Sequence, residues 1–152
     1  MELLLKLWNN RVLISAAGGW LFAQAIKISI EIAKGEFTPA RLAEGGGMPS
    51  GHSSTVTALA LSCGLTQGFD SAVFAVAVFF AVVVIFDATH VRYAAGENGK
   101  ALNRLNEERK REGKEPLFSG TMPEKLGHTV PEVLAGMAVG IFAAVLFSVW
   151  IP

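Results

Sequence analysis

The sequence of 152 residues has almost no cysteine and little charge. Its one cysteine, Cys63, lies in an apolar run, so we expect a small buried hydrophobic side chain there. One cysteine excludes both a disulfide framework and a thiolate metal cluster within a single chain. Charged residues form 17% of the chain, below the share of about 25% in soluble globular proteins. This shortage of charge argues against an ordinary water-soluble domain.

Neither sign of charge is in excess, because 13 Lys and Arg balance 13 Asp and Glu. The charges are unevenly placed: eight basic and six acidic residues lie from Arg92 to Lys125, whereas Ser53–Phe86 contains only Asp70. A nucleic-acid-binding protein needs a broad basic surface, and no part of the sequence predicts one. We therefore expect no nucleic-acid partner.

Apolar residues are abundant, at 51% of the chain, and they form runs that do not alternate with polar residues. The mean hydropathy of +0.43 agrees with this pattern. Runs of about 20 apolar residues are long enough to cross the hydrocarbon core of a bilayer. The sequence therefore predicts an all-α, polytopic membrane helix bundle, with residues 1–152 forming a single membrane-embedded domain. About four transmembrane helices are expected, at Val12 to about Ala33, Thr55–Leu65, Ala72–Phe86 (continuing through Ala95) and His128–Trp150.

Three features of this pattern need comment. Residues 1–11 fit either an interfacial amphipathic turn or the start of the first span. Thr55–Leu65 is short, so it is either a tilted span or a segment that enters from one face. Residues 96–125 form a polar connector, with a helix expected at Ala101–Arg111 and a solvated charge cluster after it.

Four spans would place the loop at residues 34–52 and the polar connector on the same side of the membrane. These two segments and their margins contain ten of the 13 basic residues. The positive-inside rule then predicts a multi-pass protein of the cell membrane with this side in the cytoplasm.

The first span carries polar side chains in its second half. Gln24, Lys27 and Glu31 recur at steps of three and four residues, so they share one helical face. Polar groups inside a span usually face protein or water and mark function. The other interpretation is that Lys27 and Glu31 form an i,i+4 pair at the membrane edge, and the sequence leaves both open.

A glycine-rich stretch, Gly45–Ser54, lies between the first two apolar runs. Glycine lets the backbone approach an anion closely, and successive amides can form an anion-binding concavity. Ser53 or Ser54 is expected to cap the following helix and so direct its positive end to the same place. Taken alone, the stretch is equally typical of an ordinary interhelical loop.

Two histidines flank this end of the predicted bundle. His52 ends the glycine-rich stretch, and His128 begins the last predicted helix with Glu132 four residues later on the same face. A carboxylate that holds one imidazole nitrogen protonated leaves the other free to act as a nucleophile or base. Lys34, Arg41 and Arg92 supply positive charge nearby in the predicted topology, which suits a site for a tetrahedral phosphate.

These motifs resemble a known family. Pro49-Ser50-Gly51-His52, preceded by Lys34 and Arg41 and followed by His128-x3-Glu132, is similar to the three-part signature of the type 2 phosphatidic acid phosphatases. This is the superfamily of membrane lipid phosphate phosphatases related to the vanadium haloperoxidases. The chain resembles the divergent membrane branch more closely, from about Gln24 to the last helix. The matching stretches are GGMPSGHS at residues 46–53, Asp87-Ala88-x-x-Val91-Arg92, Ala95-Gly96, Leu102-Asn103 and LGHTVPEV at residues 126–133.

The resemblance implies a role for each matching residue. His128 would be the nucleophile that forms a phosphohistidine, Glu132 would orient it, and His52 would protonate the leaving alkoxide and later help to activate water. Phosphate oxygens would be held by Arg41, by a lysine (Lys34 by spacing, or Lys27 from the helix) and by amides around Ser50 and Gly51. No metal or cofactor is implied, because basic side chains supply the positive charge.

The sequence departs from the wider family at several positions. Leu42 stands where the wider family has proline. Thr121 and Met122 occupy the places of a Ser-Arg pair before the nucleophile, and Arg92 is a candidate replacement for that arginine. His90 stands where the divergent branch usually has glycine. Asp87, His90 and Gln24 are accessory candidates.

Two functions follow as hypotheses. The first is a phosphatase that acts on a membrane lipid phosphate or isoprenoid phosphate. The second is a membrane protein that binds or transports a phosphate-bearing lipid without turnover, motivated by the Gln24, Lys27 and Glu31 face and by the missing arginine. Both make the lipid bilayer a partner, and the sequence leaves the oligomeric state, monomer or homo-oligomer, open.

Overall fold

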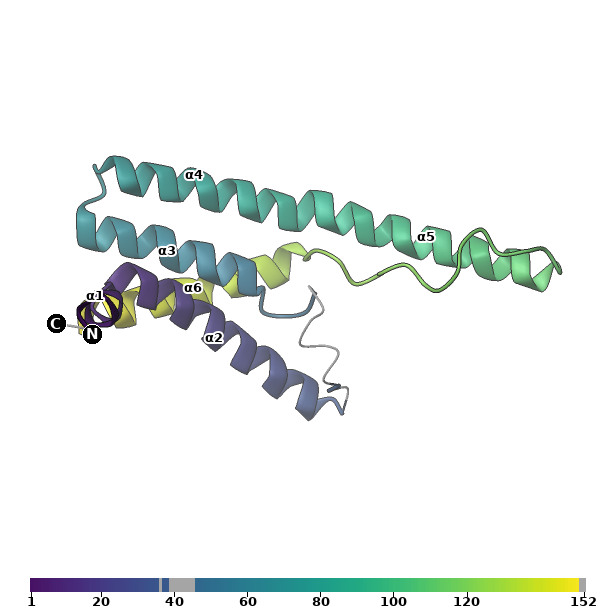
Figure 1. The fold of residues 1–152 in the computed structure, drawn as a ribbon, viewed down its shortest axis with the longest axis horizontal. Helices are drawn as coiled ribbons and strands as arrows, with labels where there is room; N and C mark the ends of the chain where they lie inside the picture. Colours follow the sequence, from purple (N-terminus) through teal and green to yellow (C-terminus); the bar gives the residue numbers. More distant parts are fainter. Residues whose placement is uncertain (36, 39–45, 151–152) are drawn as a thin grey trace.

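A computed structural model describes residues 1–35, 37–38 and 46–150. The described residues form helices and no strands, which confirms the all-α prediction (Figure 1). In chain order the elements are α1 (Glu2–Trp8), α2 (Arg11–Ala33), α3 (Gly51–Gln67), α4 (Ala72–Phe86), the π-helical turn η2 (Asp87–Val91), α5 (Arg92–Arg111) and α6 (Val130–Trp150).

In the part of the chain that the structure describes, three helices are long and apolar enough to cross a membrane: Arg11–Ala33, Val130–Ser148 and the continuous helix Ala72–Arg111. The fourth expected span, α3, has 17 residues and is therefore about 26 Å long, somewhat less than a bilayer core of roughly 30 Å. The four helices α2, α3, α4 and α6 alternate in direction, and both described ends of the chain lie at the same end of the bundle (Figure 1). The predicted membrane helix bundle is thus confirmed, with α3 shorter than each of the three candidate spans.

Several predicted boundaries were wrong. Residues 1–11 do not simply begin the first span, because α1 is a separate helix and the Asn10 side chain caps α2 by accepting from the Leu13 amide at 3.1 Å. The helix predicted to end at Ala95 continues to Arg111, because Gly96 and Gly99 do not interrupt it but provide a packing surface. The last helix begins at Val130, two residues after His128.

The predicted cap of α3 was also wrong. Its N-cap is Ser50, not Ser53 or Ser54, and the helix begins at Gly51. The Ser50 hydroxyl oxygen accepts hydrogen bonds from the Ser53 amide at 3.2 Å and from the Ser53 hydroxyl at 3.0 Å. Capping from Ser50 adds a turn at the start of the helix and brings His52 into it.

α3 lies against α2, α4 and α6, and small residues allow close approach on two of its faces. A Cβ added to Gly136 or Gly140 of α6 would meet the carbonyl oxygens of Ser50 or Ser54, each at 2.4 Å. On the other face, the Ser54 hydroxyl donates to the Gly19 carbonyl oxygen of α2 at 2.8 Å. Gly136 and Gly140, four residues apart on α6, therefore allow α3 to approach closely.

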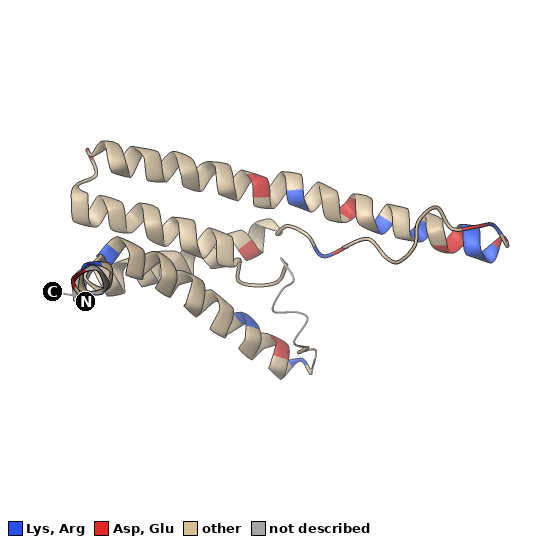
Figure 2. Ribbon diagram, viewed as in Figure 1, with Lys and Arg blue, Asp and Glu red and all other residues tan. Residues whose placement is uncertain are grey.

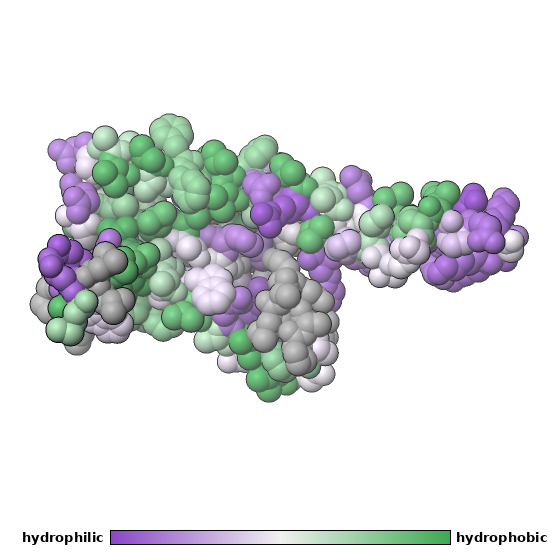
Figure 3. Space-filling view, in the orientation of Figure 1, coloured by the Kyte–Doolittle hydropathy of each residue, from purple (hydrophilic) through white to green (hydrophobic). Residues whose placement is uncertain are grey.

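Beyond the bundle, α5 and the segment at residues 112–129 form an arm (Figure 1). The segment returns along α5, where Asn103 exchanges hydrogen bonds with the Met122 backbone (2.8 and 2.9 Å) and Asn106 bonds to the backbone of Leu117 and Phe118. Charged residues gather toward the tip of the arm, whereas apolar surface covers the bundle (Figures 2 and 3). The predicted solvated connector is therefore a mostly exposed segment that returns along α5 without forming a regular element after Arg111.

Candidate functional site

The backbone on either side of His128 fixes the position of this residue. Gly127 has φ +74°, and a Cβ there would lie 2.4 Å from the Tyr93 amide nitrogen, so only glycine fits. The next amide, of His128, donates to the Ala88 carbonyl oxygen at 2.9 Å. Ala88 belongs to η2, and π-helical turns recur at functional sites because they displace the regular hydrogen-bond ladder. The return segment of the arm therefore holds His128 against Ala88 on the long helix.

The His128 ring is buried and held by Glu132. Its Nδ1 lies 3.2 Å from Glu132 Oε2, which also accepts from the Thr129 amide at 3.0 Å. The side chain of His128 is 1% exposed, and its Nε2 is buried without a hydrogen-bond partner among the described residues. An unpartnered buried ring nitrogen is costly, so Nε2 is a candidate for a functional atom.

Burial lowers the pKa of His128 below its ordinary value of 6.5. The hydrogen bond and charge of Glu132 oppose this effect, while the nearby charges of Lys27 and His52 add to it. The ring is therefore neutral at neutral pH. With the Nδ1 proton donated to Glu132, the lone pair on Nε2 is available.

His52 lies beside His128, although 75 residues separate them in the sequence. The two ring centroids are 6.0 Å apart, at an interplanar angle of 60°. This closeness follows from a direct link between the helix starts, because the Ser50 amide donates to the Glu132 carbonyl oxygen at 3.0 Å. The close approach at Gly136 pulls the same two helices together. The two histidines that the sequence predicts at this end of the bundle therefore lie close together.

Of the two lysines left open by the sequence, Lys27 is the one at this place. It is 8% exposed, its Nζ donates to the Gly46 carbonyl oxygen at 2.9 Å, and its charge reaches both histidines. Gly47, with φ +100°, lies over the Lys27 side chain. Lys34 is the exposed C-cap of α2, where no contact with the histidines is recorded.

Arg92 and Asp87, both on the long helix, are also close to His52. The Arg92 Nε is 2.7 Å from Asp87 Oδ2 in a half-exposed pair, and both charges reach His52. His90, in contrast, is exposed: its ring stacks on Phe86 at 4.3 Å and its Nδ1 lies 2.8 Å from the Thr89 hydroxyl.

The remaining predicted site residues are Gln24, Ser50, Gly51 and Arg41, and the structure describes the first three. Gln24 is half-buried on α2, almost one turn before Lys27. Ser50 is fully buried, with its amide bonded to Glu132 and its hydroxyl oxygen bonded to Ser53. Gly51 is buried in the first turn of α3, where amides have no acceptor within their own helix. Arg41 lies outside the described residues.

A cavity of about 320 Å³ lies against the outer side of Glu132. Gly46, Gly47, Gly127 and Thr129 line it, and so does Glu31 of the polar face on α2. Among the described residues no group of three or more His, Cys, Asp or Glu side chains is placed to hold a metal ion.

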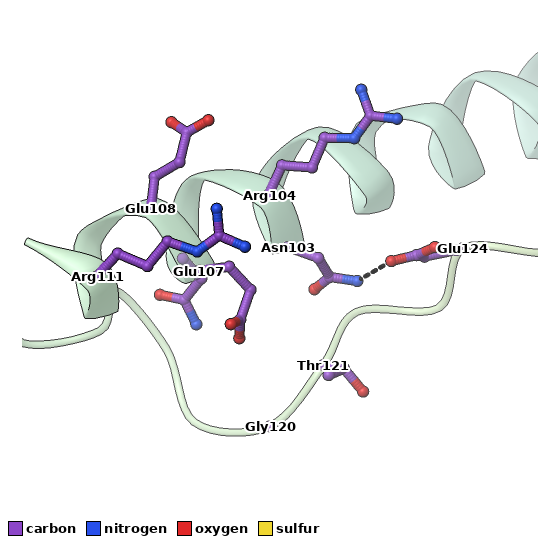
Figure 4. A pocket seen from close by; sticks show the side chains of 9 residues that line it. Asn103, Arg104, Glu107, Glu108, Arg111, Gly120, Thr121 and Glu124 are labelled. Atoms are coloured by element: carbon purple, nitrogen blue, oxygen red, sulfur yellow. Dashed lines mark hydrogen bonds between the residues drawn. The ribbon is translucent and has the colours of Figure 1, made fainter.

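A second cavity, of about 370 Å³, is confined to the arm (Figure 4). It is lined by side chains of both charges, among them Arg104, Arg111 and Glu107, with Asn103 bonded to Glu124 at 2.7 Å. Thr121 lines it as well. The positions where the wider family carries its Ser-Arg pair therefore lie along the arm and not beside the histidines.

Sequence reasoning missed the backbone contacts that hold the site. Neither the bond to Ala88 nor the approach of Gly127 to Tyr93 has a signal in a single sequence, because each depends on how the arm returns. Lys27 was named only as an alternative. Its periodicity with Gln24 and Glu31 was the available signal.

Comparisons with known proteins agree with the geometry. Residues 8–143 match the model of the divergent PAP2 family. The chain is 36% identical over 154 residues to the uncharacterized membrane protein YuiD of Bacillus subtilis (strain 168), covering 95% of this chain and 98% of that protein. No solved structure matches the chain. On the family match and on this relative, the chain is an integral membrane protein that belongs to the divergent PAP2 family.

Proposed function

We propose that this protein is a phosphatase that releases phosphate from a membrane lipid phosphate or isoprenoid phosphate through a phosphohistidine on His128. One observation carries the proposal: His128 Nε2 is buried and unpartnered, Glu132 holds the opposite nitrogen, and a second histidine ring lies 6.0 Å away. This is the arrangement of a nucleophile, its orienting carboxylate and an acid.

In the first step, His128 Nε2 attacks phosphorus and the bond from phosphorus to the lipid oxygen breaks. Protonated His52 gives its proton to that oxygen, so the lipid leaves as an alcohol. In the second step, water attacks the phosphohistidine, His52 takes a proton from the water, and the P–N bond breaks to release phosphate. Positioning and charge stabilisation supply most of the catalysis in phosphoryl transfer.

The positive charge in this mechanism comes from Lys27 and Arg92, since both are close enough to influence His52. Each has a present partner, the Gly46 carbonyl oxygen and Asp87 respectively. A bound phosphate would compete for these cations. Because Nε2 is covered in the structure, the phosphate must also displace part of its surroundings.

The proposed location is the cytoplasmic face of the cell membrane. Support comes from the ten basic residues in or beside residues 34–52 and the arm, which the predicted four-span topology places on one side of the membrane. Labelling of a Gly113→Cys variant by an impermeant maleimide tests this location. We expect labelling only after the cells are lysed, whereas labelling of intact cells would place the site outside.

The phosphatase itself is tested with purified protein in detergent and a panel of lipid and isoprenoid phosphates. We expect phosphate release by the wild type and none by His128→Ala. His90→Ala is the matched control, because it removes an exposed histidine of the same end of the bundle and should retain full activity. Folded wild-type protein that releases no phosphate from any substrate would contradict the proposal.

A second candidate is a protein that binds or transports a phosphate-bearing lipid without turnover. It is favoured by the partners already held by Lys27 and Arg92, and by the placement of Thr121 on the arm. Calorimetry with sulfate or vanadate separates the two functions. Binding that depends on His128 and Lys27, without product formation, would support this candidate.

A further inference from the structure

An apolar groove lies between α2 and α6, on the face of the bundle where these two spans meet. Its volume is about 410 Å³. Three residues from each helix line it: Phe22, Ala25 and Ile26 from α2, and Ala138, Val139 and Phe142 from α6.

The two alanines create the recess. Ala25 and Ala138 are both exposed, and each leaves room that a larger side chain would fill. Phe22 and Phe142 close the end farther from the histidines, with ring centroids 5.8 Å apart. At the other end Ile26 is followed directly by Lys27, the buried lysine of the candidate site.

The position of the groove along α6 relates it to the candidate site. Along α6, Ala138 lies six residues and Phe142 ten residues beyond Glu132, which corresponds to about 9 and 15 Å along the axis. Half of a bilayer core is also about 15 Å thick. The groove thus lies within the depth that a hydrocarbon chain reaches in one leaflet when its head is at the histidines.

We propose that this groove binds one hydrocarbon chain of the lipid phosphate, which enters sideways from the membrane between α2 and α6. The inference rests on the proposed function and deepens it, because it makes the substrate a lipid resident in the leaflet and not a water-soluble phosphate. Lys27 connects the groove with the candidate site, because its backbone adjoins the groove and its Nζ lies at the end where the phosphate would bind.

A second copy of the chain fits the groove less well. The lining residues span five positions on each helix, about 6 Å, whereas a packed helix buries a face several turns long. The α4 surface differs from the groove because large apolar side chains project from it: Val76, Phe79 and Val83 are 65–72% exposed there.

Hydrocarbon leaving the bilayer for the groove gains no hydrophobic free energy, because both surroundings are apolar. The gain is close packing and orientation. The groove should therefore affect the selectivity between long and short hydrocarbon chains more than the total affinity for the lipid phosphate.

The test compares butyl phosphate with hexadecyl phosphate in the wild type, Ala25→Trp and Ala138→Trp, all in nanodiscs. Each tryptophan fills the recess from one wall, and we expect the ratio of kcat/KM for the long chain to that for the short chain to fall about tenfold. Ala75→Trp on the exposed surface of α4 is the control and should keep the wild-type ratio. Partition of the long chain into the nanodisc is the same for every variant, so it cancels.

A hexadecyl phosphate with a diazirine in mid-chain provides a readout that does not need turnover. We expect crosslinks concentrated on residues 22–26 and 138–142, and their loss in both tryptophan variants. Equal labelling of α4, or an unchanged chain ratio in both variants, would overturn the groove while leaving the phosphatase intact. Absence of turnover with labelling confined to the groove would instead overturn the phosphatase and support the groove.

Discussion

The two sides of the molecule are built on different principles. On the side of α2, α3 and α6, small residues such as glycine, serine and alanine allow the helix backbones to pack closely. Polar side chains are buried there, among them Ser54 and His128. On the other side, the continuous helix Ala72–Arg111 contacts the bundle mainly through α3 and exposes large apolar side chains and then charges (Figure 3). The close-packed side holds the site rigidly. The long helix extends beyond the bundle, and the segment that returns along it positions His128 against Ala88.

The largest expected effect breaks the close-packed side. Gly136→Leu would drive a side chain into the Ser50 carbonyl oxygen and the Ser53 Cβ, which a Cβ alone would meet at 2.4 and 3.1 Å. We expect a loss of about 3 kcal/mol or more, with little folded protein recovered. Thermal unfolding in detergent measures it. Ala75→Leu, on the exposed surface of α4, should change nothing; similar losses in both variants would contradict the contrast between the two sides.

The next effect concerns the orientation of the nucleophile. Glu132→Gln keeps the shape and can still accept from the Thr129 amide, but it cannot hold the His128 proton in the same way. We expect kcat to fall about 100-fold or more, as for other histidines that lose an orienting carboxylate. Glu31→Gln, which changes another carboxylate on the same cavity, is the control. Equal losses in the two variants would show a general effect of charge.

A smaller effect tests the delivery of His128 by the arm. Gly127→Ala adds a Cβ that would lie 2.4 Å from the Tyr93 amide nitrogen, so the Ala88 bond to His128 should be displaced. We expect kcat to fall about tenfold with KM changed less, because the histidine is misplaced. Gly113→Ala is matched, since it has a similar φ of +72° with nothing within 4 Å. An identical loss there would assign the effect to backbone strain.

The smallest effect is a pH dependence of stability. Burial lowers the pKa of His128 in the folded protein, so between that value and about 6.5 the unfolded chain binds more protons. The contribution of His128 is therefore complete above pH 6.5 and is lost as pH falls toward the folded value. Melting temperatures measured from pH 8 to 5 should decline less steeply in His128→Gln than in the wild type. A steeper decline in the variant would contradict the assignment.

Much of the fold was predictable because apolar runs and their spacing report directly on membrane helices. The continuity from α4 to α5 was not, since Gly96 and Gly99 resemble helix breakers until the return segment is seen to pack on them. The two histidines were predictable from their motifs and the topology. Their support by Ala88, Gly127 and Lys27 was not fully predictable, because it depends on tertiary contacts between distant segments.

The central claim is that His128 Nε2 becomes covalently bound to phosphorus. The most direct measurement is to mix ³²P-labelled lipid phosphate with wild-type protein, to quench the reaction with base during the first turnovers, and to map the label. We predict a base-stable, acid-labile phosphohistidine on the peptide that contains His128, absent in His128→Asn and unchanged in His90→Gln. Label on another residue, or undiminished turnover in His128→Asn, would contradict the account.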